Sequence, residues 1–141
     1  MHERSHVVIV EDNRADLNLI TRSMREAGVD CDVTSFVDGA DARAFVRAAN
    51  SPVPDLMVLD LNLPSVDGAS VLDSVRSSVR WFDVPVIVFT SSTAPSDVAT
   101  IQKLRADAYI VKPSKLEEFF RIGSVIRAWL EKHQASPAGE P

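Results

Sequence analysis

Five short runs rich in branched apolar residues recur along the chain, and each is followed by a stretch with helical spacing of apolar positions. The runs occupy residues 7–10, 31–36, 56–59, 84–89 and 108–111. A run such as Val7-Val8-Ile9-Val10, apolar at every position, is typical of a strand buried on both faces. Short connections between such strands and helices favour parallel pairing. The sequence therefore predicts an α/β fold with a doubly wound, five-stranded parallel sheet and five helices.

Local signals predict where the first two helices begin and end. Asn13 is expected to cap the first helix, with Asp16 in a capping-box position, and Gly28 to end it. Asp38 is expected to cap the second helix, which ends before Ser51-Pro52. These signals place each helix directly after a strand.

The later helices carry similar signals. The third is predicted to end near Val79, and the fourth has Pro95 in its first turn. Ser114 and Glu117 form the pattern of a capping box for a last helix that reaches about Lys132. We expect one domain over residues 5–132 and a disordered tail over residues 133–141.

Composition narrows the functional classes. The chain has 141 residues, 45% apolar and 25% charged, and a formal net charge of −5. Lys and Arg do not cluster in any stretch as a nucleic-acid groove would require. No apolar run is long enough for a membrane span, and the start of the chain lacks the form of a signal peptide. The single cysteine, Cys31, precludes an internal disulfide and is interpreted as a small core residue rather than a redox thiol. These features predict a cytoplasmic protein.

Polar residues stand where four of the predicted strands end. Glu11 and Asp12 follow the first strand, Asp60 the third, Thr90 ends the fourth, and Lys112 follows the fifth. In a doubly wound sheet, ligands bind beyond the carboxyl ends of the strands. The second strand ends without such a group, which suggests that it lies at an edge.

The three carboxylates would repel one another, and Lys112 supplies only one positive charge. Mg²⁺ is the natural cation for such a site because it takes carboxylates, water and phosphate oxygens. A carboxylate is also a competent nucleophile toward a phosphoryl group, whose oxygens Lys112 and Thr90 could hold. Each residue alone has a simpler interpretation, such as an acidic first turn or a strand-end hydroxyl. Their joint placement favours a site.

These residues resemble the motifs of the CheY-like receiver family of bacterial response regulators. The matching segments are Val10-Glu11-Asp12, Leu59-Asp60-Leu61-Asn62-Leu63-Pro64 with Asp67-Gly68, Phe89-Thr90-Ser91, and Tyr109-Ile110-Val111-Lys112-Pro113. The ordered set is specific and covers about residues 5–132. The resemblance implies a flavodoxin-like sheet with strand order 2-1-3-4-5.

The resemblance also implies roles for individual residues. Asp60 would accept the phosphoryl group, and Lys112 would pair with the acceptor and then with the phosphoryl group. The metal ligands would be Glu11 (largely through water, because it is longer than the Asp of some relatives), Asp12, Asp60 and the main-chain carbonyl of Asn62. Thr90 and Tyr109 would form the conformational switch, and the Lys112–Pro113 bond would be cis.

A finer resemblance, in Val10-Glu11-Asp12-Asn13 with Asp16 and in the last helix, is to small regulators that work with phytochrome-type sensor kinases. It implies phosphoryl transfer from a sensor histidine kinase, a bacteriophytochrome in the finer match, and self-dephosphorylation rather than turnover of external substrates. No output domain follows Lys132 in the sequence, so the signal is expected to leave through the surface of the domain.

The last helix carries more apolar residues than one stripe requires, among them Leu116, Phe119 and Trp129. Two interpretations stay open: the helix is set deeply in the core, or part of this face joins a second subunit. We predict a homodimer through the fourth helix, fifth strand and fifth helix.

Two other functions compete with a receiver. A phosphatase of the haloacid dehalogenase type also uses a strand-end aspartate with Mg²⁺. It has an Asp-x-Asp pair after its first strand, however, whereas Asp60 ends the third strand and Asn62 replaces the second carboxylate. An interaction module without phosphorylation would have little use for buried charges such as Asp60 and Lys112.

Overall fold

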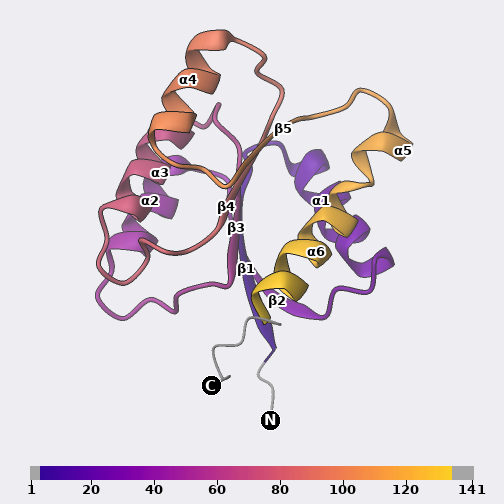
Figure 1. The fold of residues 1–141 in the computed structure, drawn as a ribbon, viewed down its shortest axis with the longest axis horizontal. Helices are drawn as coiled ribbons and strands as arrows, with labels where there is room; N and C mark the ends of the chain where they lie inside the picture. Colours follow the sequence, from indigo (N-terminus) through magenta and orange to yellow (C-terminus); the bar gives the residue numbers. More distant parts are fainter. Residues whose placement is uncertain (1–3, 135–141) are drawn as a thin grey trace.

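The structure, a computed structural model, describes residues 4–134 and has one five-stranded parallel sheet at its centre (Figure 1). The strands are β1 Ser5–Val10, β2 Cys31–Phe36, β3 Leu56–Leu59, β4 Val86–Thr90 and β5 Ala108–Val111. They lie in the order β2-β1-β3-β4-β5, and each neighbouring pair is parallel. The predicted fold and strand order are confirmed.

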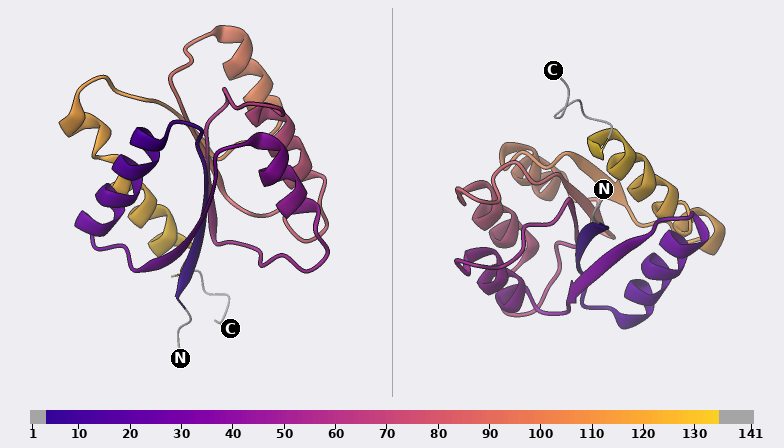
Figure 2. Two further views of the ribbon diagram at one scale, coloured as in Figure 1. Left: turned by 180° about the vertical axis from the view of Figure 1, so that it is seen from behind. Right: turned by 90° about the horizontal axis from the view of Figure 1, so that it is seen from below.

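Helices cover both faces of this sheet. They are α1 Arg14–Glu26, α2 Gly39–Arg47, α3 Gly68–Arg76, α4 Pro95–Lys103, α5 Leu116–Phe119 and α6 Ile122–Gln134. Figures 1 and 2 show α2, α3 and α4 on one face and α1, α5 and α6 on the other. The predicted fifth helix is thus divided into α5 and α6, and the five strand–helix units are confirmed.

Successive residues of each central strand enter different cores because side chains alternate between the faces of a sheet. In β1, Val8 and Val10 pack in the core beneath α2, α3 and α4. Val7 and Ile9 pack in the core beneath α1, α5 and α6. All four positions are therefore buried, which explains why the strand is apolar throughout.

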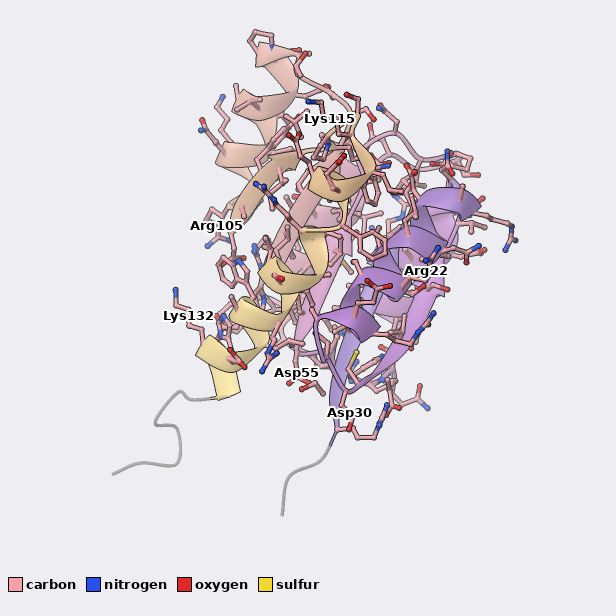
Figure 3. All side chains as sticks on the ribbon, turned by 90° about the vertical axis from the view of Figure 1, so that its right-hand side faces the viewer. Arg22, Asp30, Asp55, Arg105, Lys115 and Lys132 are labelled. Atoms are coloured by element: carbon pink, nitrogen blue, oxygen red, sulfur yellow. The ribbon has the colours of Figure 1, made fainter. Side chains whose placement is uncertain are left out.

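Two contacts fix α6 on α1. The helices approach so closely at Gly123 that a Cβ atom there would lie 2.2 Å from the Ser23 carbonyl oxygen. Arg127 of α6 donates to the Ala27 carbonyl at the end of α1, over 2.7 Å. Charged side chains such as Arg22 and Lys132 point outward from this face (Figure 3). The α1–α6 layer thus packs apolar side chains against the sheet and exposes charged ones.

Most predicted helix signals occur in the structure. Asn13 and Asp38 accept N–H groups of α1 and α2, Pro95 begins α4, and Gly28 follows α1 with a φ of 82°. The Ser114–Glu117 capping box was wrong: α5 begins after Lys115, which makes no side-chain cap. The third helix ends at Arg76 rather than Val79.

The remaining predictions concern burial and the chain end. Cys31 is half-buried against the α1–α6 core, as expected of a small core residue. Helix α6 reaches Gln134, and the predicted tail from residue 135 onward lies outside the described residues. Within residues 4–134, no helix combines the length and the apolar character needed to cross a bilayer.

Candidate functional site

Three carboxylates meet at the carboxyl edge of the sheet. Glu11 and Asp12 follow β1 and Asp60 follows β3, and these strands are direct neighbours in the sheet. The N–H of Asp60 donates to the Val10 carbonyl over 3.0 Å, which ties the two strand ends together. One oxygen from each carboxylate lies within 4.8 Å of the others. Residues 49 positions apart in the chain therefore form one acidic cluster.

The loop after β3 holds the Asp60 carboxylate in place. Its Oδ1 accepts the N–H of Leu61 over 2.6 Å, and the N–H of Asn62 lies 3.4 Å away. The backbone at Gly68 packs against this segment, because a Cβ there would lie 2.2 Å from the Asp60 carbonyl oxygen. The Asp67-Gly68 motif thus has a steric role: it lets the start of α3 approach the carboxylate-bearing turn.

Lys112 supplies the positive charge of the site. Its Nζ lies 2.8 Å from Glu11 Oε1, 2.8 Å from Asp16 Oδ2 and 3.0 Å from Asp60 Oδ2. The side chain is only 8% exposed. Its own N–H donates to the Thr90 carbonyl over 2.8 Å, which continues the β4–β5 ladder and fixes the base of the side chain. The ammonium is therefore held over the acidic cluster.

The expected cis bond between Lys112 and Pro113 was wrong. Every peptide bond within residues 4–134 is trans. Lys112 reaches the carboxylates without a cis bond, because its backbone continues the strand ladder and its four-carbon side chain spans the remaining distance.

Burial and the neighbouring charges shift the pKa values of Glu11 and Lys112. Burial and, after it, the nearby charge of Asp60 raise the pKa of Glu11 from 4.5 to about 7, against the hydrogen bond from Lys112. Burial disfavours the Lys112 ammonium, but hydrogen bonds to Asp16, Glu11 and Asp60 outweigh it and raise the Lys112 pKa. The raised pKa of Glu11 therefore reflects mainly its burial and only secondarily the repulsion from Asp60.

The three carboxyl groups of the cluster face one ammonium, that of Lys112, and this balance bears on whether the residues fit a divalent cation. The cluster offers three oxygen donors of the kind that Mg²⁺ and Mn²⁺ prefer, within a span that one ion could bridge. A cation there would favour the ionised form of Glu11, whose pKa is raised without it. The residues fit a hard divalent metal.

Asp16 is a site residue that sequence reasoning missed. It was interpreted as the third position of a capping box, whose side chain would reach back to the Asn13 N–H. Instead, Glu11 Oε2 accepts that N–H over 3.1 Å, and the Asp16 carboxylate faces Lys112. The available signal was its place in the first turn of a helix that directly follows the Glu11-Asp12 pair.

The two predicted switch residues lie on β4 and β5. Thr90 is fully buried at the end of β4, and its Oγ1 lies 3.4 Å from the Ser92 N–H. Tyr109 is half-buried, and its hydroxyl donates to the Ser92 carbonyl over 3.0 Å. Both side chains therefore contact the β4–α4 loop at Ser92.

Asn62 is exposed, and the predicted contact of its main-chain carbonyl with a metal stays a prediction.

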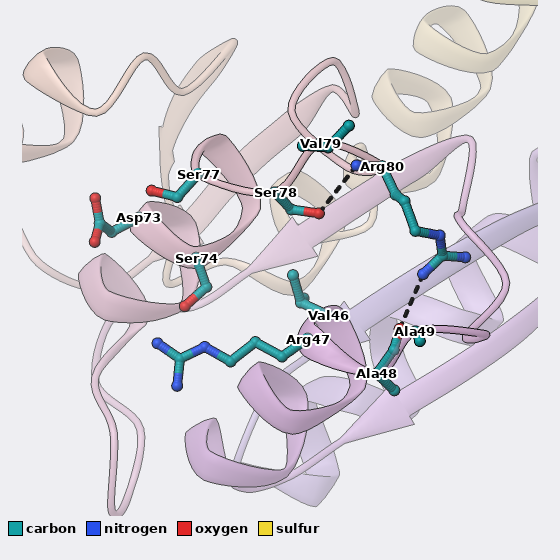
Figure 4. Close-up of a pocket in the computed structure, with 10 residues that line it drawn as sticks. All are labelled: Val46, Arg47, Ala48, Ala49, Asp73, Ser74, Ser77, Ser78, Val79 and Arg80. Atoms are coloured by element: carbon teal, nitrogen blue, oxygen red, sulfur yellow. Dashed lines mark hydrogen bonds between the residues drawn. The ribbon is translucent and has the colours of Figure 1, made fainter.

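The surface also contains hollows. One of about 370 Å³ adjoins the site and is lined by Asp16, Leu19, Ser91, Lys112, Pro113, Ser114, Leu116 and Phe119. Another, of about 350 Å³, lies between the ends of α2 and α3 (Figure 4). There Arg80 donates to the carbonyls of Ala48 and Ser51 and so caps the end of α2. At the α2–α3 hollow Arg80 therefore has a structural role, whereas the first hollow opens onto Lys112.

Comparison with known proteins gives a consistent picture. The family model described as response regulator receiver domain matches residues 7–122. The chain is similar to the response regulator Rcp1 of Synechocystis sp., with 33% identity over 130 residues, 89% of this chain and 88% of that protein. The match therefore spans nearly all of both proteins.

Solved structures resemble this one closely. The phosphorylated cyanobacterial phytochrome response regulator RcpA is 32% identical with a TM-score of 0.85, over 92% of this chain and 96% of that one. The Mn²⁺-bound form of Rcp1 is 31% identical with a TM-score of 0.84, over 90% and 95%. The bacteriophytochrome response regulator RtBRR is 33% identical with a TM-score of 0.73, over 91% and 78%.

Proposed function

Because this chain belongs to the family of response regulator receiver domains, we propose that Asp60 accepts a phosphoryl group from a sensor histidine kinase. A carboxylate oxygen of Asp60 attacks phosphorus, the bond from phosphorus to the kinase histidine breaks, and the imidazole leaves with the bonding electrons. The resulting acyl phosphate is later hydrolysed by water. We propose no turnover of external phosphoesters.

One observation carries this proposal: the Lys112 ammonium lies 3.0 Å from Asp60 Oδ2, inside a pocket of carboxylates. Phosphoryl transfer depends mainly on positioning and on stabilisation of charge at the phosphoryl oxygens. Lys112 is close enough to donate to an oxygen attached to Asp60. Meanwhile the N–H of Leu61 holds the other carboxylate oxygen in a fixed orientation.

Glu11, Asp12 and Asp60, together with the main-chain carbonyl of Asn62, would hold Mg²⁺ at this site. The bound ion would neutralise negative charge where the phosphoryl group arrives. The acidic cluster supports a divalent metal, as does the Mn²⁺-bound structure of the relative Rcp1. We choose Mg²⁺ because this ion prefers oxygen ligands and binds phosphate oxygens.

We assign the response to phosphorylation to Thr90 and Tyr109. Thr90 would turn its hydroxyl toward the new phosphoryl oxygens, and the β4–α4 loop would follow. The contacts of both residues with Ser92 support this coupling, because movement of Thr90 alters the loop that Tyr109 holds. The change would thereby reach α4 and β5.

The proposed kinase is of the phytochrome type. Support comes from the likeness to RcpA, a phytochrome response regulator, and to RtBRR, a bacteriophytochrome response regulator. The hollow beside Lys112, with Leu19 and Leu116 among its lining residues, offers a partner a surface next to the site. The cytoplasmic location inferred from the sequence stays a prediction.

We also propose a homodimer through α4, β5 and the α5–α6 region. Val111 is 41% exposed, and Trp129 is half-buried rather than enclosed in the core. Most apolar residues of α6, such as Ile126 and Leu130, are buried, so the deep-core interpretation accounts for the greater part of this helix. Light scattering that finds only monomer, with and without a phosphoryl analogue, would count against the dimer.

Intact-mass measurement tests the central proposal. The protein is incubated with Mg²⁺ and acetyl phosphate, and one added phosphoryl group is expected. The gain should be absent in Asp60→Asn and after removal of metal by a chelator, and present in Asp41→Asn, which alters an exposed aspartate at the start of α2. Release of phosphate from many esters would favour the hydrolase, and no mass change with any donor or kinase would favour the inert module.

A further inference from the structure

Carboxylate oxygens of the protein surround the Lys112 ammonium on several sides. An ammonium group has three N–H donors. Three carboxylate oxygens, from Asp16, Glu11 and Asp60, lie within 3.0 Å of Nζ. Nζ donates hydrogen bonds to Asp16 Oδ2 and Asp60 Oδ2 and forms an ion pair with Glu11 Oε1, so an oxygen that arrives at the site competes with these partners.

Two of the three carboxylate partners of Lys112 have a second proposed interaction. Glu11 and Asp60 belong to the acidic cluster that fits a divalent cation, and Asp60 is also the proposed phosphoryl acceptor. Asp16 does not belong to that cluster. It is thus the one partner of Lys112 that has no other assigned task.

Asp16 is itself well placed to act as an anchor. Its N–H donates to the Asn13 side chain over 3.0 Å, which fixes it in the first turn of α1. Its side chain is 25% exposed, whereas that of Lys112 is 8% exposed, so the ion pair lies at the rim of the site. Partial burial makes such a pair stronger than a surface ion pair.

We propose that Asp16 is a positioning residue that holds the Lys112 ammonium beside Asp60 while the oxygens of Glu11 and Asp60 engage the metal or the phosphoryl group. Without this anchor, the flexible lysine side chain would sample several positions, and fewer of them would serve the transfer. This inference rests on the proposed phosphorylation of Asp60.

Asp41 provides a matched control. Like Asp16, it is the third residue after a side-chain helix cap, Asp38 in its case, and it contributes the same acidic charge to a first turn. Asp41 is exposed and lies at the start of α2. Any effect that comes only from the helix dipole should appear in both positions.

Kinetics in a double-mutant cycle test the proposal. Asp16→Ala should slow phosphorylation by acetyl phosphate with Mg²⁺ about tenfold, because loss of positioning lowers the rate. Asp16→Asn, which keeps an oxygen acceptor, should lose less, and Asp41→Ala should retain the rate. In a Lys112→Ala background, Asp16→Ala should have no further effect, since its partner is gone. An equal loss in that background, or no loss in the single variant, would overturn the proposal.

Nuclear magnetic resonance of the ¹⁵N-labelled lysine ammonium supplies a second readout that requires no phosphorylation. The Lys112 signal, assigned by its loss in Lys112→Ala, should be sharp in the unaltered protein and in Asp41→Ala. It should broaden or shift in Asp16→Ala, because one of the two hydrogen bonds that Nζ donates is lost. An unchanged signal would contradict the anchoring role.

The two proposals fail in different ways. If the unaltered protein takes no phosphoryl group, the proposed function fails, whereas failure of the anchor is visible only in the Asp16 variants.

Discussion

The starts of α1 and α2 have the same local design. Each follows a strand, and each begins with a side-chain cap: Asn13 accepts the Asp16 N–H over 3.0 Å, and Asp38 accepts the Ala40 N–H over 2.7 Å. Each also has an aspartate three residues after the cap, Asp16 or Asp41. The cap and the first-turn aspartate by themselves give no reason to expect different roles.

Their surroundings in the sheet differ. Strand β1 is an inner strand next to β3, and the first turn of α1 brings Asp16 within 2.8 Å of Lys112 at the end of β5. Strand β2 is an edge strand, and the Asp38 carboxylate at its end accepts the Ala40 N–H over 2.7 Å and the Ser65 hydroxyl over 3.0 Å. Capping residues therefore decide where each helix starts, whereas the strands that end nearby decide which side chains its first turn contacts.

The largest difference between the two helix starts should appear in metal binding. Asp12→Ala should lower the affinity for Mg²⁺ by more than about tenfold, because even outer residues of a metal site commonly contribute that much. Asp38→Asn, which keeps its oxygen acceptor at the β2 end, should leave the affinity unchanged. Isothermal titration calorimetry measures both. Equal affinities in the two variants would remove Asp12 from the proposed site.

Glu11 should make the stability of the metal-free protein depend on pH. Its pKa is about 7 in the folded protein against an ordinary value of 4.5, so the folded state keeps a proton that the unfolded chain has lost. Stability is therefore greatest below the ordinary value and falls as pH rises through about 7, by about 1–3 kcal/mol in total.

Urea unfolding in the presence of a chelator, at about pH 5 and about pH 8, measures this dependence. Glu11→Gln should flatten the profile, because the glutamine side chain does not titrate. Asp41→Asn should keep it. A rise in stability over this range that Glu11→Gln abolishes would contradict the assigned direction of the pKa shift.

Both caps should stabilise the fold to a similar extent. Asn13→Ala and Asp38→Ala should each lower the free energy of unfolding by about 1 kcal/mol, the usual contribution of a side-chain cap. Asp38→Ala also removes the acceptor of the Ser65 hydroxyl, so its loss should be the larger of the two. Urea denaturation at one pH provides the measurement. A negligible effect at either position would show that the cap hydrogen bond there is unimportant.

The smallest effect belongs to Asp41. Asp41→Ala should lower the free energy of unfolding by only about 0.3–1 kcal/mol, the range of a helix-dipole interaction. Its rate of phosphorylation should equal that of the unaltered protein. A slower rate would mean that first-turn charge acts on the site from a distance, and the contrast between Asp16 and Asp41 would then disappear.

Several differences between the predicted and observed elements have local physical causes. Strand β4 begins at Val86 rather than residue 84 because the Val84 N–H bonds the Trp81 carbonyl in a turn and Pro85 has no N–H. Helix α3 stops early because the Ser78 hydroxyl accepts the N–H groups of Arg80 and Trp81. Side chains that compete for backbone groups are visible in the sequence, but which competitor wins depends on the surrounding packing.

The sequence by itself determined the five strands, the start of α1 and α2, and the edge where Glu11, Asp12, Asp60 and Lys112 gather. These features depend on apolar patterns and on the parallel direction of the strands, which places all carboxyl ends together. Only the tertiary structure decided that Lys112 has three carboxylate partners, that Asp16 is one of them, and that burial raises the pKa of Glu11. These depend on distances between segments far apart in the chain, and a local pattern carries no distance.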